Sequence, residues 1–486
     1  KETGDAVRKL ELPGVKVDED YKRYYPYGSL ASKVLGFTGG DNQGVIGLEV
    51  QYDAYLKGTN GKILTMTDAR GVEMENGAED RIEPVAGNDL RISLDMEIQQ
   101  YAEQLAYQTL EKKNAKKVSI IVMNPQNGEI YAMVNVPEFD LNDPFTPDQN
   151  LRSESLRNQA AERDKTVKQQ ELLNAMWRNT CINDTYEPGS TFKIITAAAG
   201  LEEGVVKLTD PFSCPGFRVV EDRRIRCHKA GGHGAETFLQ GVMNSCNPVF
   251  IDVGQRLGSD NYYKYFVQFG LKQKTGIDLP GEATGKIFTE DTMRSADLAT
   301  SSFGQSQTVT MVQMAAAFSS VVNGGYYYTP HVVKEIQNEN GATVSEIETQ
   351  PVHKVVTAET SKLLRGYLYK TVEEGTAKAA QVKGYKVGGK TGTAEKYPRK
   401  KKNYLVSFIG FTPVEHPEVV IYVVIDQPHV EDQAHSTYAT EFASSVMGDV
   451  LPMLGVYKND SSGGKTKVQL PSTKNGNLPL EVPKGG

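Results

Sequence analysis

Residues 186–193 read Tyr-Glu-Pro-Gly-Ser-Thr-Phe-Lys, and the apolar stretch Ile-Ile-Thr-Ala-Ala-Ala follows directly. The Pro188-Gly189 pair breaks the chain, so we predict a turn that leads into a helix with Ser190 in its first turn. Ser190 and Lys193 are three residues apart and therefore share one helical face. A serine hydroxyl needs an adjacent base to become a nucleophile, and a partly buried lysine can be neutral enough to serve. The stretch predicts a nucleophilic serine, although Ser-x-x-Lys alone more often marks a surface pair.

Two further motifs strengthen this interpretation. Ser245-Cys246-Asn247 lies 55 residues after Ser190, and Lys390-Thr391-Gly392 lies 200 residues after it. Ser-x-x-Lys, Ser-x-Asn and Lys-Thr-Gly in this order form the signature of penicillin-binding proteins and serine β-lactamases. Each motif alone has an ordinary explanation, a helix cap for Ser245 and a strand end for Lys390. Their joint occurrence at domain-scale spacing favours an acyl-transfer enzyme.

The first two motifs supply the nucleophile and its proton carriers. We expect Ser190 to attack a peptide carbonyl while Lys193 takes its proton. Ser245 can relay a proton to the leaving amine, and Asn247 can hydrogen-bond the substrate amide.

The third motif supplies substrate contacts. Lys390 carries a positive charge and Thr391 a hydroxyl, which together suit a substrate carboxylate. Backbone N–H groups of Ser190 and Thr393 are expected to form the oxyanion hole. Gly392 is expected to let the strand approach the substrate closely.

The hydrophobic pattern around these motifs predicts an α+β fold, in which an antiparallel sheet is flanked by helices. An Asn-Gly turn at residues 124–128 predicts a hairpin between two of the strands. Helices are expected at 96–114 and 437–454, and strands at 62–67, 90–94, 117–123, 129–134, 404–410 and 419–425.

Composition divides the chain into three parts. Residues 1–95 are rich in Tyr and Gly with short alternating runs, and we predict an irregular, β-rich, non-catalytic pedestal. Residues 96–455 are expected to form the catalytic domain. After Lys458 the chain turns to Gly, Ser, Lys, Asn and Pro, so residues 456–486 are interpreted as a linker-like tail.

Overall counts exclude several classes of protein. The 486 residues carry 54 Lys and Arg against 61 Asp and Glu, a net charge of −7 that argues against nucleic acid as a partner. No apolar window is long enough for a transmembrane helix. The chain starts at Lys1, so we expect that a membrane anchor has been removed before it. Four cysteines are too few for a disulfide scaffold.

The chain resembles class B penicillin-binding proteins, the monofunctional peptidoglycan D,D-transpeptidases, over about residues 10–455. The segments that carry the resemblance are 44–49, Tyr52, 55–58, 93–95, 98–99, 178–179, 186–193, 303–305 and 308–310. The resemblance implies a penicillin-binding transpeptidase fold and an acyl-enzyme on Ser190, formed from D-Ala-D-Ala stem peptides or from β-lactams, with no cofactor for the chemistry. It also implies a single N-terminal anchor in the cell membrane, a catalytic domain on the outer face and a membrane glycan polymerase as partner.

Within this class the chain is most similar to the sporulation-specific member, through residues 21–28 and through Cys227 and Cys246, which stand 19 residues apart. That similarity implies a role in spore cortex synthesis and a redox-switchable Cys227–Cys246 disulfide beside the active site. A vegetative septal division transpeptidase is the alternative. A β-lactamase and a β-lactam sensor are further alternatives, but neither explains the pedestal.

Cysteine and histidine are concentrated in one segment. Cys214, Cys227, His228, His233 and Cys246 lie within 33 residues. We predict a structural Zn²⁺ site of the Cys3His kind formed by Cys214, Cys227, His228 and Cys246, with His233 as a substitute ligand. A Cys227–Cys246 disulfide and unpaired buried thiols remain alternatives. Outside this segment, Cys181 is interpreted as a structural thiol.

A basic run follows the Lys-Thr-Gly segment. Residues 399–402 read Arg-Lys-Lys-Lys, and we interpret them as a solvated hairpin tip.

Overall fold

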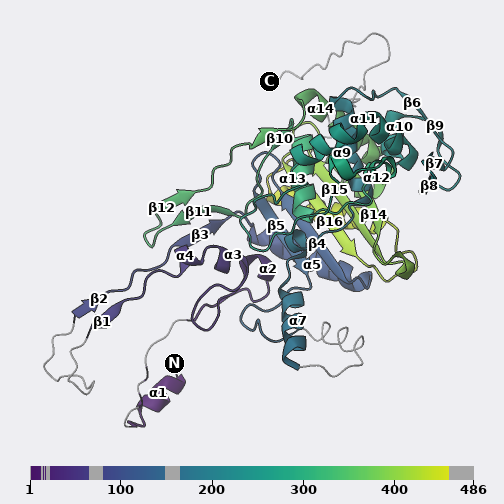
Figure 1. The fold of residues 1–486 in the computed structure, drawn as a ribbon. Coiled ribbons are helices and arrows are strands. Elements are labelled where there is room, and N and C mark those ends of the chain that lie inside the picture. Colours follow the sequence, from purple (N-terminus) through teal and green to yellow (C-terminus); the bar gives the residue numbers. More distant parts are fainter. Residues whose placement is uncertain are drawn as a thin grey trace. The chain divides into compact units, whose positions relative to one another are not determined.

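The computed structural model describes residues 2–12, 15, 17, 22–64, 80–147 and 165–458. The chain forms two compact units (Figure 1), each of which is described separately. The first unit comprises Lys1–Asp89, Phe139–Trp177 and Gln337–Ala342. The second comprises Leu90–Glu138, Arg178–Ile336 and Thr343–Gly486.

The first unit is built from short elements around a small aromatic core. Its elements are α1 (Glu2–Arg8), α2 (Ser32–Leu35), α3 (Gly47–Gln51), α4 (Asp53–Leu56), β1 (Lys62–Leu64), β2 (Asp80–Ile82) and α7 (Lys165–Trp177). Phe37, Phe139, Leu141, Leu173 and Met176 are buried together. The strand expected at 62–67 is β1, which pairs with β2 in antiparallel fashion, while residues 65–67 lie outside the described residues.

The second unit is organised around a five-stranded antiparallel sheet in the order β14-β15-β16-β4-β5. These strands are β4 (Lys117–Met123), β5 (Ile130–Val136), β14 (Gly388–Glu395), β15 (Tyr404–Thr412) and β16 (Val419–Asp426). The predicted hairpin at 124–128 joins β4 to β5. Strands β4, β15 and β16 are almost continuously apolar because both faces of the sheet are covered.

Helices cover one face of this sheet through a continuous apolar core. Helix α5 (Met96–Lys112) and helix α15 (Thr437–Met453) bury Ile98 and Val446 against strand residues such as Val423. The start of α5 was expected from the sequence, and its physical cause is the Asp95 carboxylate, which accepts the Ile98 N–H at 3.0 Å.

The opposite face of the sheet carries the helices that position the site. The remaining helical elements of this unit, of which η3 packs with α15 on the first face, are α8 (Thr180–Asn183), η1 (Gly189–Thr191), α9 (Lys193–Glu202), α10 (Phe238–Met243), α11 (Asn247–Gln268), η2 (Glu290–Thr292), α12 (Ser295–Ser301), α13 (Met311–Val322), α14 (Ala358–Glu373), η3 (Lys378–Ala380) and η4 (Arg399–Lys401). Helix α13 is buried along its whole length and contacts β4, β15 and β16. A buried helix on this face gives the neighbouring α9 a rigid support.

Small strands complete the second unit. They are β3 (Asp89–Ile92), β6 (Pro211–Cys214), β7 (Phe217–Val220), β8 (Arg223–Arg226), β9 (Gly234–Thr237), β10 (Tyr326–Tyr327), β11 (Val333–Gln337), β12 (Thr343–Glu346) and β13 (His353–Lys354). Strand β6 pairs with β9, and β7 pairs with β8. The α+β fold class predicted from the sequence is confirmed.

The division of the chain differs from the expected single boundary after residue 95. The structure divides the chain at Asp89/Leu90 and adds Phe139–Trp177 to the first unit. The physical reason is that the apolar residues of this later segment pack around Phe37. The expected tail lies almost wholly outside the described residues, since the description ends at Lys458. Within the described residues, no helix combines the length and apolar character needed to cross a lipid bilayer.

Candidate active site

The turn at residues 188–191 carries Ser190, the predicted nucleophile, and is called the nucleophile turn below; close backbone contacts shape it. Ser190 lies in η1, immediately before α9, and is half-buried. The Gly189 N–H donates to the Gly304 carbonyl at 3.0 Å, and Gly189 has a φ of 57°. A Cβ at Gly189 would lie 2.5 Å from the Thr393 carbonyl oxygen, so only glycine lets the turn approach β14 this closely.

Lys193 is the centre of the polar contacts around Ser190. Its side chain is buried, and its Nζ lies 3.0 Å from Ser190 Oγ and 3.1 Å from Ser245 Oγ. The same nitrogen donates to the Ser245 carbonyl and to Asn247 Oδ1, both at 2.7 Å. Burial lowers the pKa of Lys193 to about 7, while Cys227 and other acidic groups nearby oppose that shift. A neutral amine that touches two hydroxyls can accept a proton from one and transfer it through the other.

The Ser245-Cys246-Asn247 segment connects α10 to α11. Ser245 is 5% exposed and has a φ of 53°, an uncommon left-handed conformation for a serine. Asn247 begins α11, and its Nδ2 donates to the Arg226 carbonyl at 3.0 Å. These contacts orient the Asn247 amide, so that its Oδ1 faces Lys193.

The Lys390-Thr-Gly-Thr segment lies on β14. Lys390 is fully buried, and its Nζ donates to the Thr391 carbonyl at 3.2 Å. Burial, together with the charge of Lys193, holds the pKa of Lys390 well below its usual value. The Thr393 hydroxyl donates to the Ala434 carbonyl at 3.2 Å, which fixes the orientation of this side chain.

Gly392 has a structural role beyond the expected approach to substrate. A Cβ at this position would lie 2.4 Å from Ser407 Oγ and 3.0 Å from Thr191 Cγ2. The missing side chain therefore lets β14 pack against both β15 and the nucleophile turn. Ser190, Ser245 and Asn247 all contact the Lys193 amine directly. The third motif does not contact this amine but packs against the nucleophile turn through Gly392.

One contact in the site was not anticipated from the sequence. The Glu187 carboxylate accepts the Ser306 N–H at 2.8 Å and lies 3.2 Å from Arg399 Nη2. Burial raises the pKa of Glu187, while Ser306 and Arg399 act in the opposite direction. Arg399 was interpreted as part of a solvated tip, which fits the exposed Lys400 and Lys401 but not Arg399 itself. No sequence signal distinguished Arg399 from the lysines that follow it.

The cysteine cluster adjoins the Ser245 segment. Sγ of Cys214, Cys227 and Cys246 and a ring nitrogen of His233 all lie within 4.8 Å of one another. The three thiols are buried and free, and Cys181 is a separate buried thiol. His233, predicted as the substitute ligand, therefore lies with the three thiols, and His228 is not a member of this group.

The two histidines differ in burial. The His228 side chain is exposed, with its Nδ1 3.8 Å from Cys227 Sγ, whereas the His233 side chain is only 7% exposed. A hydrogen bond shared by Cys227 and Cys246 lowers the pKa of the Cys227 thiol and raises that of Cys246. The pair therefore favours one thiolate, the form that binds metal.

Comparison with known proteins gives matches over almost the whole chain. Residues 118–448 match the penicillin-binding protein transpeptidase domain, and residues 6–92 match the penicillin-binding protein dimerisation domain. Stage V sporulation protein D of Bacillus subtilis is 41% identical over 99% of this chain and 71% of that protein. Peptidoglycan D,D-transpeptidase MrdA of Acinetobacter baumannii is 28% identical over 90% of this chain and 67% of that protein.

A solved structure supports the same assignment. Penicillin-binding protein 3 of Mycobacterium tuberculosis, complexed with ampicillin, superposes with a TM-score of 0.75 at 26% identity. The match covers 92% of this chain and 93% of that one. The motifs, the fold and these similarities lead to one conclusion: the chain belongs to the class B penicillin-binding proteins, the family of peptidoglycan D,D-transpeptidases.

Proposed function

We propose that this protein cross-links peptidoglycan stem peptides by acyl transfer through Ser190, and that it does so in spore cortex synthesis. The observation that carries the reaction is the contact of one buried, weakly basic amine, Lys193, with both Ser190 and Ser245. The similarity to a sporulation protein supports the cellular role. The vegetative septal division transpeptidase remains the alternative role.

The reaction divides into two acyl transfers. Ser190 Oγ attacks the carbonyl between the two D-Ala residues as its proton passes to Lys193 Nζ. Backbone N–H groups of Ser190 and Thr393 stabilise the oxyanion of the tetrahedral intermediate. The proton moves from Lys193 through Ser245 to the leaving amine, and the terminal D-Ala departs.

The second transfer reverses these roles. An amine of a neighbouring stem peptide attacks the acyl-enzyme carbonyl and gives its proton back through Ser245 and Lys193. Asn247 orients the substrate amide, while Lys390 and Thr391 bind its carboxylate. β-Lactams enter the first step as substrate mimics and remain on Ser190.

The test is labelling with a fluorescent penicillin. Wild-type protein and Ser445→Ala, a control at an exposed serine, should form a covalent adduct, and Ser190→Ala should form none. An adduct on Ser190→Ala would refute the assignment. A rapid loss of label from the wild type would instead indicate a β-lactamase, and failure to join a stem peptide to an acceptor amine would indicate a sensor.

We also propose that Cys214, Cys227, His233 and Cys246 hold a structural Zn²⁺ ion. Tetrahedral zinc has Zn–S distances of about 2.3 Å and Zn–N distances of about 2.0 Å, so its ligand atoms lie roughly 3.5–3.8 Å apart. The four ligand atoms lie within 4.8 Å of one another, so shifts of about 1 Å or less on binding would bring them to that spacing. Zinc bound here would hold Cys246, and with it Ser245 and Asn247, in place.

Metal content and a thiol count test this site. We expect about one zinc per chain with few reactive thiols, loss of zinc in His233→Ala, and retention in His228→Ala, the matched control. Absence of metal with two thiols missing would support the Cys227–Cys246 disulfide. Absence of metal with four reactive thiols would support unpaired thiols.

The family resemblance supports two further proposals about the whole protein. We propose that a single N-terminal anchor holds it in the cell membrane with the catalytic unit on the outer face. We propose that its partner is a membrane glycan polymerase of the sporulation complex, which supplies the strands to be cross-linked.

A further inference from the structure

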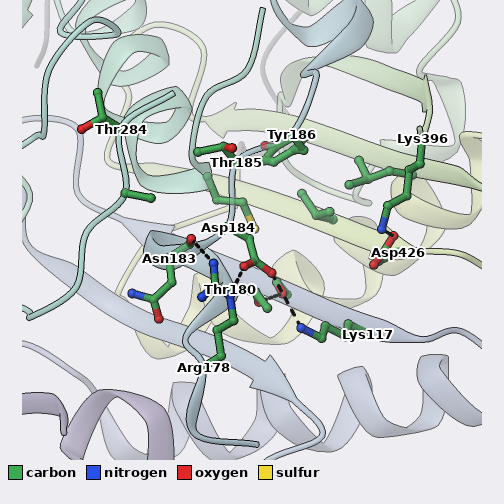
Figure 2. Close-up of a pocket in the computed structure, with 15 residues that line it drawn as sticks. Lys117, Arg178, Thr180, Asn183, Asp184, Thr185, Tyr186, Thr284, Lys396 and Asp426 are labelled. Carbon is green, nitrogen blue, oxygen red and sulfur yellow. Dashed lines mark hydrogen bonds and ion pairs between the residues drawn. The ribbon is translucent and has the colours of Figure 1, made fainter. Parts of the chain in front are cut away.

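A cavity of about 360 Å³ lies in the second unit, and its lining includes neither Lys193 nor the residues that contact the Lys193 amine (Figure 2). Its floor is the end of the central sheet, where β4, β15 and β16 supply Lys117, Ser119, Leu405, Val424 and Asp426. The segment from Arg178 to Tyr186 forms one wall, and Thr284, Met311 and Lys396 lie on others. A cavity of this size accommodates a small organic molecule.

The lining of this cavity carries more positive than negative charges. Lys117, Arg178 and Lys396 face only two carboxylates, Asp184 and Asp426. Asp426 lies 2.5 Å from Lys396, and Asp184 contacts Arg178. In Figure 2 the two groups stand apart, with Arg178 and Lys117 converging on Asp184 and the Lys396–Asp426 pair to the right.

Of the three cations that line the cavity, Lys117 is the one whose charge is least neutralised by a nearby carboxylate. The Lys117 side chain is 25% exposed, and its Nζ lies 3.7 Å from Asp184 Oδ2, close to the limit of an ion pair. Burial lowers the pKa of Lys117 despite both carboxylates. A buried ammonium group gains stability from an additional anion, because a nearby negative charge offsets the loss of hydration.

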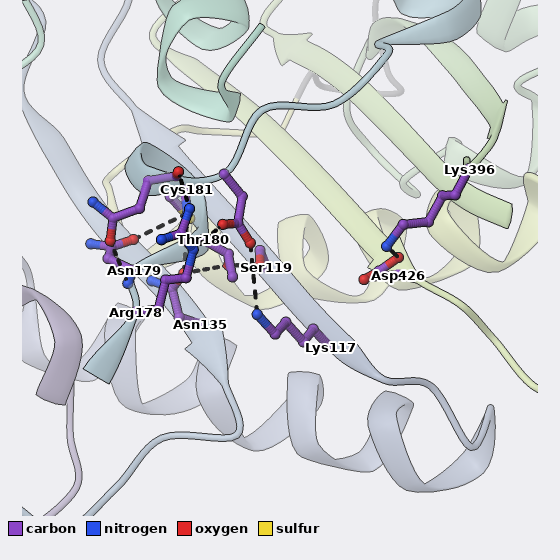
Figure 3. Close-up of polar contacts among 11 residues, drawn as sticks. Lys117, Ser119, Asn135, Arg178, Asn179, Thr180, Cys181, Lys396 and Asp426 are labelled. Carbon is purple, nitrogen blue, oxygen red and sulfur yellow. Dashed lines mark hydrogen bonds and ion pairs between the residues drawn. The ribbon is translucent and has the colours of Figure 1, made fainter. Parts of the chain in front are cut away.

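The wall behind Lys117 is rigid. The Ser119 and Thr180 hydroxyls share a hydrogen bond at 2.7 Å, and the Thr180 hydroxyl also lies 2.7 Å from the accepting Asn135 Oδ1. Figure 3 shows these three residues in contact. The Cys181 N–H donates to Asn135 Oδ1 at 3.2 Å. These hydrogen bonds fix α8 to the sheet. The shape of this wall is therefore held by a fixed backbone as well as by side chains.

From this geometry we infer that the cavity binds a small organic anion, with its carboxylate or phosphate held by Lys117 and Arg178. Hydroxyls of Thr185 and Thr284 line the cavity and suit the polar part of such a ligand. Tyr186, Leu405 and Val424 offer it an apolar surface.

Two tyrosines in contact with each other connect this cavity to the nucleophile turn. The Tyr186 hydroxyl lies 2.5 Å from the Tyr422 hydroxyl, and Tyr422 in turn hydrogen-bonds Thr191, the neighbour of Ser190. Lys396 directly follows β14, the strand that carries Lys390 and Thr393. A bound anion therefore changes the rate at which Ser190 is acylated, a consequence that rests on the proposed function of Ser190.

Calorimetric titration of the full chain at constant ionic strength tests the site. Succinate and inorganic phosphate are the two probes, and they distinguish a carboxylate from a phosphate ligand. At least one should bind saturably, with a dissociation constant on the order of 1 mM. Lys117→Gln should weaken that binding about tenfold or more, and Lys116→Gln, an exposed neighbour with the same loss of charge, should leave it unchanged.

Two further measurements test where the probe binds and whether its binding affects Ser190. A crystal soaked with the bound probe should show it between Lys117 and Arg178, whether or not the Lys117→Gln variant folds. Absence of saturable binding by both probes, or equal weakening by the two variants, would overturn the site. Binding that leaves penicillin acylation of the wild type unchanged would overturn its coupling to Ser190, while adduct formation itself tests Ser190 separately.

Discussion

Replacing Arg399 by alanine tests how the oxyanion hole is held together. The two expected N–H donors, those of Ser190 and Thr393, belong to different elements, η1 and β14. Glu187, three residues before Ser190, contacts Arg399, four residues after the end of β14. We expect that loss of this ion pair lets the two donors drift apart and slows acylation.

The size of the effect follows from burial. Exposed ion pairs contribute about 0–1 kcal/mol, and removal of one partner from a fully buried pair costs about 3–5 kcal/mol. Here the Arg399 side chain is 36% exposed and that of Glu187 is 8% exposed, so solvent screens the pair in part. In the Arg399→Ala variant the Glu187 carboxylate also keeps the hydrogen bond that the Ser306 N–H donates to it. An intermediate cost of about 1–2 kcal/mol corresponds to a roughly 5- to 30-fold slower reaction if it falls on the transition state.

The assay is the second-order rate constant for acylation by a fluorescent penicillin. Lys400→Ala and Lys401→Ala remove the same charge from exposed positions in the same run and should stay within about twofold of the wild type. An equal loss of acylation rate in these controls would mean that general electrostatic attraction, not the Glu187–Arg399 ion pair, is responsible. An unchanged rate in Arg399→Ala would refute the reasoning directly.

Three other outcomes are expected. The acylation rate should rise as pH increases through about 7, since burial lowers the pKa of Lys193 to about 7 and only its neutral amine accepts a proton; a flat profile between about pH 5 and 9 would contradict this. Gly392→Ala should slow acylation about tenfold or more, because its Cβ would lie 2.4 Å from Ser407 Oγ, and Ser407→Ala should restore part of the rate if that contact is the cause. Phe37→Ala should lower the unfolding free energy of the first unit by about 3–5 kcal/mol in calorimetry, and Tyr24→Ala, at a position 73% exposed, should not.

Sequence by itself determined the parts of this protein that depend on local pattern. The motif residues Ser190, Ser245 and Lys390 stand at recognisable spacings, and the Pro188-Gly189 pair marks the turn before Ser190. Strands β4, β15 and β16 of the central sheet were predictable because burial on both faces demands unbroken apolar runs, and the β4–β5 hairpin was predictable from its Asn-Gly turn.

Tertiary structure alone decided the contacts between distant segments. The sequence prediction named His228, the neighbour of Cys227, as a cluster ligand, but the path of the chain between β8 and β9 buries His233 beside the thiols and leaves His228 exposed. Arg399 resembles the three lysines after it, yet only its side chain reaches Glu187, 212 residues earlier. In both cases the residue type allows either role, and the choice depends on which side chain the folded backbone directs inward, a property that no local sequence pattern contains.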